Sequence, residues 1–482
     1  MQFVISNDEW NDADEQDKPS LNQKFYSDND IYDFYAARRR KLCASIGKGI
    51  LILRSSAGYN GGRHEFRVSN NFFYLTGLSE PNCILILDSR KEKNYSLSIR
   101  KRSMRDIVYN GDAYDMEKLR NEYLPDYLSS YDDEEQCIKD NINLDCPIFF
   151  ENTDIQTKSI LEDYCEMNNK SGLLNDVSPI ISEQRVFKDK LEISYIKNAI
   201  DITGEAFINA CIHAHPEVKE NIIEAEIESV FMKKGAKMPA FRSIVASTPN
   251  NTILHYEANN NTLEDVDLLL MDIGAEYNCY ASDISRTIPV GRKFTDEQRE
   301  IYELILKAQE AAIEVMKPGN YITQAHHQAA EVICNGLYDL GLITDLMADW
   351  QRKFYILYPC CHFLGLDVHD VGDYGETMAV LKQNLVNPKV TGRRLEAGMI
   401  LTVEPGLYLR EKGMQQLFDL YGSEVEHHII EEFIQKVTPT YNKYKNIGIR
   451  IEDDILITPK GNINLSIDIP KQTNDIEKLM IS

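Results

Sequence analysis

The spacing of apolar residues changes between residues 178 and 191, and this change limits the folds that the chain can adopt. Before it, three short apolar runs bounded by Gly, Pro, Asn and Asp predict strands at 49–53, 83–87 and 95–99. After it, apolar residues recur at helical spacing from Leu191. A chain of 482 residues is too long for one ordinary hydrophobic core. We therefore predict an acidic lead at 1–24, a mixed α/β domain at 25–178 and an α+β domain at 179–482.

The second domain contains a helix whose two ends can be read from the sequence. Thr295 and Gln298 form a capping-box pair, and apolar residues follow at helical spacing until Pro318 and Gly319 end the helix. A further helix with one apolar side begins near Ile322. Strands are predicted around 268–273, 279–289, 399–404 and 447–457.

The charge balance excludes several classes of partner. The chain carries 52 Lys and Arg against 76 Asp and Glu, a formal net charge of −24. Nucleic acids and membrane surfaces bind clustered Lys and Arg, so neither is expected as a partner. Apolar runs are far shorter than the ~20 residues of a membrane-spanning helix, and the acidic start differs from a basic targeting peptide. Ten cysteines without CxxC spacing favour reduced thiols, so we expect a cytoplasmic protein.

Two carboxylates lie in a predicted hairpin of the second domain. The segment DLLLMDIGAEYNCYASDIS places Asp272 on one apolar strand and Asp283 on the next. A turn centred on Tyr277 and Asn278 pairs residues whose numbers add up to 555, and 272 + 283 = 555. The two side chains would then be direct cross-strand neighbours, ~4.5 to 5.5 Å apart at Cβ. Ionised carboxylates this close repel each other, so the pair is either exposed to water or shares a cation.

Further acids and histidines favour the cation. Glu404 ends an apolar strand before Pro405, and Glu452 lies on the otherwise apolar strand IGIRIEDDILI. His362 and His369, in HFLGLDVHD, flank an apolar stretch that has little use for two imidazoles in packing. Four carboxylates and one imidazole suit a pair of divalent ions, with oxygen ligands favouring Mn²⁺ and tolerating Zn²⁺, Co²⁺ or Fe²⁺. Two such ions can activate water and polarise a carbonyl, so the expected chemistry is hydrolysis.

Five ordered motifs resemble those of the pita-bread metallopeptidases, and most closely those of the Xaa-Pro aminopeptidases (aminopeptidase P). The motifs are RVSNNFFYLTGLSEP in the first domain and, in the second, GAEYNCYASDISRTIPVGRKFTDEQREIYELIL, HFLGLDVHDVGDYG, AGMILTVEPGLYL and GIRIEDDILIT. The resemblance extends from about residue 25 to residue 480. It implies a pita-bread catalytic domain that releases the first residue from peptides with proline at position two.

The resemblance also assigns roles to single residues. The metal ligands that it implies are Asp272, Asp283, His362, Glu404 and Glu452. Asp283 and Glu452 would bridge both ions, and Glu404 would also handle the proton of the attacking water. His369 would contact the substrate and stabilise charge near the scissile bond. His255 would line the substrate pocket, and Arg450 would lie behind the ligands, offset their charge and help to form the substrate site. A homodimer or homotetramer is expected.

Two departures from the family pattern leave alternatives open. The stretch before His362 reads YPCC, whereas the family usually has a histidine four residues before the metal-binding one, so the wall facing the substrate is altered. An insert after Tyr408 is similar to one in prolidases, which makes an Xaa-Pro dipeptidase the first alternative. The second is a non-catalytic pita-bread binding protein, although such proteins usually lack several of the five ligands. The other histidines, including His326, are expected to pack or to lie at the surface.

Overall fold

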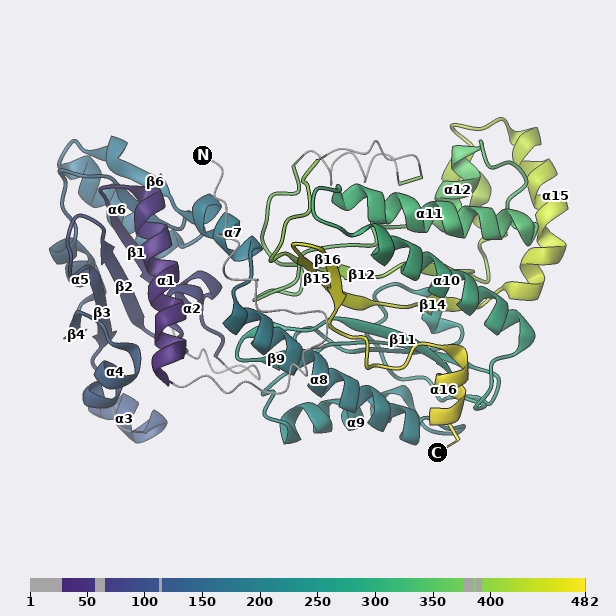
Figure 1. The fold of residues 1–482 in the computed structure, drawn as a ribbon, viewed down its shortest axis with the longest axis horizontal. Helices are drawn as coiled ribbons and strands as arrows, with labels where there is room; N and C mark the ends of the chain where they lie inside the picture. The colour runs from purple at the N-terminus through teal and green to yellow at the C-terminus, as the bar shows by residue number, and fades with distance from the viewer. Residues whose placement is uncertain (1–27, 57–65, 112–114, 376–384, 387–391, 482) are drawn as a thin grey trace. The chain divides into compact units, whose positions relative to one another are not determined.

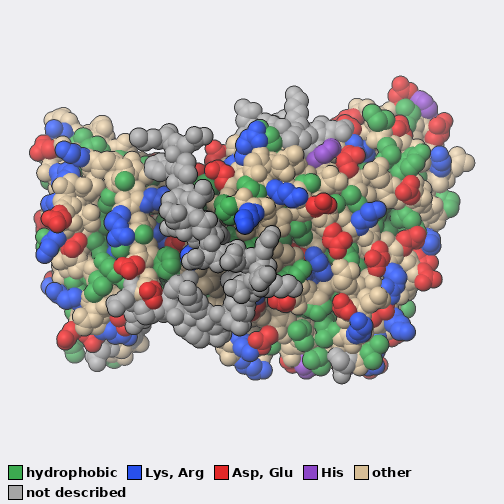
Figure 2. Space-filling model, in the orientation of Figure 1, with side chains coloured by type: hydrophobic (Ala, Val, Ile, Leu, Met, Phe, Trp, Pro, Cys, Tyr) green, Lys and Arg blue, Asp and Glu red, His purple; other side chains and the backbone are tan. Residues whose placement is uncertain are grey.

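The computed structural model describes residues 28–56, 66–111, 115–375, 385–386 and 392–481. The chain divides into two compact units between Arg185 and Val186, at the end of the short helix α7 (Ser178–Val186). Both units mix helices and strands, which agrees with the predicted α+β class (Figure 1). Acidic and basic side chains are interspersed on the face of each unit shown in Figure 2. The predicted acidic lead lies outside the described residues.

The first unit is built on one six-stranded sheet with the strand order β4-β3-β2-β1-β5-β6. Its strands are β1 (Ile50–Arg54), β2 (Cys83–Asp88), β3 (Tyr95–Arg100), β4 (Tyr127–Tyr131), β5 (Ile148–Phe150) and β6 (Leu174–Asp176). Strands β1 to β3 pair antiparallel, whereas β4, β5 and β6 join the sheet in parallel. The three strands predicted from apolar runs are confirmed as β1, β2 and β3.

The runs in β1 and β2 are continuously apolar because both faces of this sheet are covered. On one face, Ile50 and Ile84 pack against Ile138 of α5 (Glu134–Asn141) and Leu161 of α6 (Ile155–Met167). Leu51, which points to the other face, is equally buried. Helices α1 (Asp28–Ile46) and α2 (Asn70–Thr76) contact β2 and β1. The unit also contains the short helices α3 (Met104–Asn110) and α4 (Met116–Tyr123).

Among the described residues, the second unit combines four small sheets with two pairs of long helices (Figure 1). The sheets combine β11 (Ile284–Pro289), β8 (Leu268–Ile273) and β7 (Ile244–Ser247); β12 (Ile400–Val403), β15 (Asp453–Thr458) and β16 (Gly461–Asn464); β13 (Gly406–Tyr408) and β14 (Gly448–Arg450); and β9 (Glu276–Tyr277) and β10 (Tyr280–Ala281). The paired helices are α8 (Lys190–His213) with α9 (Glu220–Lys233), and α10 (Asp296–Val315) with α11 (Ile322–Asp339). Shorter or peripheral helices are α12 (Asp349–Tyr355), α14 (Leu417–Tyr421), α15 (His427–Tyr444) and α16 (Thr473–Leu479).

The predicted start of α10 is confirmed. Thr295 Oγ1 accepts a hydrogen bond from Gln298 N at 3.2 Å, and Gln298 Oε1 accepts one from Thr295 N at 2.9 Å. The helix ends at Val315, before the predicted Pro318 stop. Among the described residues, no helix combines the length and the apolar character that crossing a membrane would require.

Two of the predicted strands are wrong as continuous strands. The predicted strand 279–289 is divided into β10 and β11, and the predicted strand 447–457 is divided into β14 and β15. In both cases the chain leaves one sheet and enters another. The apolar alternation runs through the break, and alternation alone reports which face a side chain takes, not which sheet the strand joins.

Candidate metal centre

Three of the predicted ligands lie where one strand ends and another begins. Asp283 separates β10 from β11, Glu404 follows β12 and precedes β13, and Glu452 separates β14 from β15. Asp272 lies within β8, and a backbone hydrogen bond ties His362 to β12. The breaks bring side chains from different sheets to one place, which a single continuous sheet would not do.

Asp283, His362 and Glu452 can each direct a ligand atom into one shared space. Their candidate ligand atoms all lie within 4.8 Å of one another. His362 Nε2 is 3.4 Å from Asp283 Oδ2 and 3.5 Å from Glu404 Oε1. The three residues are buried, with Glu452 only 1% exposed. The sequence prediction that these side chains converge is therefore reproduced in the fold.

Two oxygens of these carboxylates lack a hydrogen-bond partner among the described residues. They are Oδ1 of Asp272 and Oε1 of Glu452, and both are buried. A buried polar atom without a partner costs free energy, so such an atom needs an explanation such as a bound ion. Carboxylate oxygens with one imidazole are a donor set for divalent cations. The residues present therefore fit a divalent metal centre.

Burial and mutual repulsion raise the pKa values of three carboxyl groups in this cluster. Burial raises the pKa of Asp283 well above its usual value, and the charges of Asp272 and Glu404 add to the effect. Burial and the charge of Asp283 raise the pKa of Glu452, while burial and the charge of Glu452 raise the pKa of Glu404. The fully ionised cluster is thus unfavourable by itself, and either protons or a cation would stabilise it.

His362 is held in a state that can bind a metal ion. Burial lowers the pKa of His362 to about 3, and the neighbouring His369 adds to the effect. The Nδ1 atom lies 3.1 Å from the carbonyl oxygen of Phe363, which can only accept, so Nδ1 carries the proton. Nε2 then presents its lone pair to the carboxylates. A backbone acceptor that fixes the tautomer in this way is typical of metal-binding histidines.

The predicted hairpin register is wrong by two residues. Asp272 of β8 pairs with Ser285 of β11, so the paired numbers add up to 557. The turn falls at Asn278 and Cys279, whose φ values of 47° and 66° suit a two-residue hairpin turn. Because side chains alternate with a period of two, Asp272 and Asp283 stay on one face, but they become diagonal instead of direct neighbours.

Arg450 holds two of the predicted ligands, Asp272 and Glu452, from behind. Its buried guanidinium donates from Nε to Ser285 Oγ and from Nη1 to Tyr408 Oη, each at 2.8 Å. Nη2 forms an ion pair with Asp272. Ser285 Oγ donates in turn to Glu452 Oε2 at 2.9 Å. One guanidinium therefore orients Asp272 directly and Glu452 through a hydroxyl group.

Ser285 and Tyr408 have no role in the sequence prediction. Ser285 follows Asp283 by two residues, so strand alternation alone could have placed it on the same face. Tyr408 offers no local signal, because its partner Arg450 is 42 residues further along the chain.

His255 and His369, the two histidines predicted to contact the substrate, are exposed to solvent, whereas His362 is buried. The rings of His362 and His369 pack edge to face, with centroids 4.3 Å apart. Burial of the imidazole lowers the pKa of His369, and the charge of His255 lowers it further, so the two side chains lie within electrostatic range. Both His255 and His369 remain accessible to solvent. A neutral His369 beside the ligands can donate a hydrogen bond to a bound molecule.

Comparison with known proteins identifies the family. The model of metallopeptidase family M24 matches residues 194–459, and the model of the aminopeptidase P N-terminal domain matches residues 35–148. The chain belongs to metallopeptidase family M24. Among its M24 relatives, the Xaa-Pro aminopeptidase of Haemophilus influenzae is 36% identical over 427 residues, which cover 86% of this chain and 89% of that protein. The Xaa-Pro aminopeptidase of Escherichia coli is 31% identical over 437 residues, which cover 87% of this chain and 90% of that protein.

Solved structures of aminopeptidase P share the fold of this M24 chain. Aminopeptidase PepP of Pseudomonas aeruginosa matches with a TM-score of 0.79 and 31% identity, covering 93% of this chain and 98% of that one. A variant of Escherichia coli aminopeptidase P in complex with substrate matches with a TM-score of 0.80 and 29% identity, again covering 93% and 98%. The predicted pita-bread fold with an aminopeptidase P-like N-terminal domain is confirmed.

The YPCC segment, where this M24 chain departs from the family pattern, is bound to the strand end that carries Glu404. Tyr358 Oη donates to the backbone oxygen of Glu404 at 2.9 Å, and Glu404 N donates to Cys360 O at 2.9 Å. Cys360 N donates to Nδ1 of the buried His326 at 3.3 Å. His326 thus packs against the wall of the site, as expected for a histidine without acidic partners. The altered wall supports the predicted ligand Glu404 through hydrogen bonds to its backbone.

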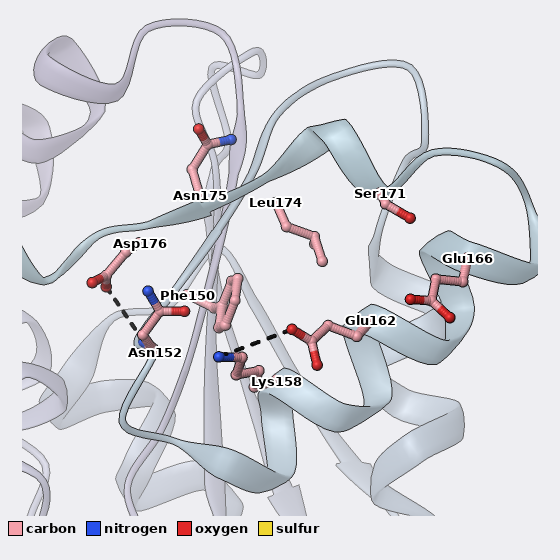
Figure 3. A pocket seen from close by; sticks show the side chains of 9 residues that line it. All are labelled: Phe150, Asn152, Lys158, Glu162, Glu166, Ser171, Leu174, Asn175 and Asp176. Carbon is pink, nitrogen blue, oxygen red and sulfur yellow. Dashed lines mark hydrogen bonds and ion pairs between the residues drawn. The ribbon is translucent and has the colours of Figure 1, made fainter.

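A separate polar cavity of about 280 Å³ lies in the first unit (Figure 3). Its lining comes from β5, α6, β6 and the segments between them. Lys158 lies 3.9 Å from Glu162, and the backbone N–H of Asn152 donates to Asp176 at 3.3 Å. None of the predicted site residues of this M24 chain lines the cavity, and we assign it no function.

Proposed function

We propose that this M24 chain is an Xaa-Pro aminopeptidase, which hydrolyses the bond between the N-terminal residue of a peptide and a proline at position two. The observation that carries the proposal is the gathering of four carboxylates and one neutral imidazole. Two buried oxygens of these carboxylates lack a hydrogen-bond partner in the part of the chain that the structure describes. Two relatives at 36% and 31% identity bear the name of this activity. The complex of the similar Escherichia coli enzyme with substrate gives further support.

Two divalent ions form part of the proposal, and Asp272, Asp283, His362, Glu404 and Glu452 would hold them. The predominance of oxygen ligands favours Mn²⁺. A zinc-substituted aminopeptidase P of Escherichia coli is among the similar structures, which supports Zn²⁺ as a substitute. When bound, such ions lower the pKa of water and polarise a carbonyl group.

The side chains of the enzyme supply the proton path and the substrate contacts in this proposal. Glu404 takes a proton from the attacking water and delivers it to the proline nitrogen. His369 donates a hydrogen bond to the carbonyl oxygen as negative charge develops there. His255 lines the pocket on the accessible side. An Xaa-Pro bond is a tertiary amide without N–H, so recognition by β-ladder hydrogen bonds is lost and a dedicated pocket replaces it.

Hydrolysis of Ala-Pro-Ala and of Ala-Pro by metal-stripped protein, with and without Mn²⁺, tests the proposed function. We expect Mn²⁺-dependent release of alanine from the tripeptide, measured by chromatography of the products. Ala-Ala-Ala is the matched substrate without proline and should react far more slowly. Cleavage of Ala-Pro alone would establish a dipeptidase. Failure of the folded protein to cleave any substrate with Mn²⁺, Zn²⁺, Co²⁺ or Fe²⁺ would contradict the peptidase assignment.

A cytoplasmic homodimer or homotetramer completes the proposal. None of the ten cysteines, all of which lie among the described residues, forms a disulfide, which suits a reducing compartment. Light scattering after size-exclusion chromatography should give the mass of two or four chains, and metal analysis of the same peak should give two divalent ions per chain.

Substitution of Arg450 by lysine should show whether activity depends on the positive charge alone or also on the hydrogen bonds of the guanidinium group. Arg450→Lys keeps the positive charge but cannot donate to Asp272, Ser285 and Tyr408 from one planar fork. We expect kcat/KM for Ala-Pro-Ala to fall by roughly 10- to 150-fold, because hydrogen bonds to charged groups contribute about 1.5 to 3 kcal/mol. Steady-state kinetics measure this loss, and circular dichroism verifies the fold.

The matched control for this substitution is Arg299→Lys. Arg299 pairs with Glu477 away from the ligands, so kcat/KM should remain at the wild-type value. An equal loss in both variants would mean that Arg450 has no special role in orienting the ligands.

A further inference from the structure

Glu220 is a fully buried carboxylate outside the metal centre, and it begins helix α9. We propose that Glu220 is a positioning residue for peptide hydrolysis, because it fixes the loop that carries His255. The inference rests on the proposed function, since His255 is assigned there to the substrate pocket. The hydrogen bonds of the Glu220 carboxylate go to Ser247, Tyr256 and Asn261, and none of these residues is a predicted metal ligand or substrate contact.

Glu220 binds the loop at both of its ends and near its middle. Oε1 accepts hydrogen bonds from the backbone N–H and the hydroxyl of Ser247, each at 2.7 Å. Oε2 accepts from Tyr256 Oη and from the backbone N–H of Asn261, each at 2.8 Å. The backbone N–H of Glu220 also donates to Asn261 O at 2.9 Å. Ser247 ends β7. The Glu220 side chain therefore joins the two ends of the segment from Ser247 to Asn261 by hydrogen bonds.

The contact pattern requires a carboxylate. Each oxygen of Glu220 accepts from a backbone N–H, one from Ser247 and one from Asn261. A glutamine has one carbonyl oxygen and one NH₂ group, so it would place a donor against one of these backbone donors. A buried donor left without an acceptor is destabilising. Glu220→Gln therefore loosens one end of the loop while leaving the shape of the side chain almost unchanged.

Tyr256 connects this clamp to the site. Its ring belongs to a buried cluster with Ile244, Leu270 and Tyr408, and its hydroxyl donates to Glu220. His255 is the preceding residue, so a shift of the Tyr256 backbone moves the imidazole that lies in electrostatic range of His369. The packing of the Tyr256 ring and the hydrogen bond of its hydroxyl therefore fix the position of the neighbouring His255.

A double-mutant cycle tests the proposal on the metal-loaded enzyme. The variants are Glu220→Gln, His255→Ala and the combination of both, each assayed for kcat and KM with Ala-Pro-Ala. We expect Glu220→Gln alone to lower kcat/KM by roughly 10- to 100-fold. In the His255→Ala background the same substitution should have almost no effect, because residues that act through one another are non-additive. Independent, multiplying losses, or wild-type kinetics of Glu220→Gln, would overturn the proposal.

A matched pair of milder variants keeps the test decisive if Glu220→Gln does not fold. Tyr256→Phe and Ser247→Ala each remove one hydroxyl donor from the same carboxylate. Tyr256→Phe should lower kcat/KM in the wild-type background and not in the His255→Ala background, whereas Ser247→Ala should leave kcat/KM nearly unchanged. Equal effects of the two variants would show that Glu220 stabilises the fold without positioning His255.

Hydrogen exchange separates failure of this inference from failure of the proposed function. If the wild-type enzyme cleaves neither peptide, the peptidase assignment fails, but the clamp can still be measured. Amides in the loop between Ser247 and Asn261 should exchange faster in the Tyr256→Phe variant than in wild type, with exchange in α10 unchanged. Unchanged exchange in the loop would overturn the clamp itself.

Discussion

Asp283→Asn should abolish peptide hydrolysis and, at the same time, raise the melting temperature of the metal-free protein. Asp283 is buried beside Asp272 and Glu404, and both charges raise its pKa in addition to burial. The substitution removes a proposed metal ligand, so we expect kcat/KM to fall by at least about 1,000-fold, equivalent to roughly 4 kcal/mol. Without metal, the same change removes a repulsive charge and should raise the melting temperature by a few degrees.

The two effects are measured on one preparation. Steady-state hydrolysis of Ala-Pro-Ala with added Mn²⁺ gives the loss of activity, and thermal denaturation followed by circular dichroism in excess chelator gives the melting temperature. Asp419→Asn is the control, since Asp419 is an exposed aspartate on α14. It should change neither quantity. A metal-free Asp283→Asn protein that melts below wild type would mean that the ionised cluster is not under electrostatic strain.

The candidate site could be predicted because its acids interrupt apolar strands. Glu404 and Glu452 stand out against apolar neighbours, and both lie at strand ends in the structure. The exact pairing of Asp272 could not be predicted, since the register depends on where the turn falls. Asn278 is a common residue at positive φ, but nothing in the sequence indicates that Cys279 shares this conformation.

Contacts between distant parts of the chain account for most of what the sequence did not reveal. The buried ion pair between Lys188 and Asp370, at 2.9 Å, joins residues 182 positions apart and fixes the residue next to His369. Glu220 acts on a loop that begins 27 positions later. Periodicity reports the face on which a side chain lies, and spacing reports turns, but neither identifies the partner of a buried charge. Only the assembled fold does so.

Removal of the metal ions should make stability fall as pH rises. In the folded, metal-free protein the pKa values of Asp283, Glu404 and Glu452 lie above their usual values of 3.8, 4.5 and 4.5, with burial as the largest cause in each case. The folded state then binds more protons than the unfolded state, so the free energy of unfolding decreases with pH. The stabilisation by these protons is complete below about pH 4 and is lost as pH rises through the raised pKa values of the folded state.

Melting temperatures at about pH 5 and about pH 8, with chelator and with Mn²⁺, measure this effect. We expect the gap between the metal-loaded and metal-free forms to widen with pH, because metal ions compete with protons for the same oxygens. Glu452→Gln distinguishes the contribution of this cluster from that of other titrating groups, because it removes one carboxyl group whose pKa is raised. Its metal-free melting temperature should therefore depend less on pH than that of wild type. Identical pH dependence of wild type and Glu452→Gln in chelator would show that these carboxylates do not control the stability of the metal-free enzyme.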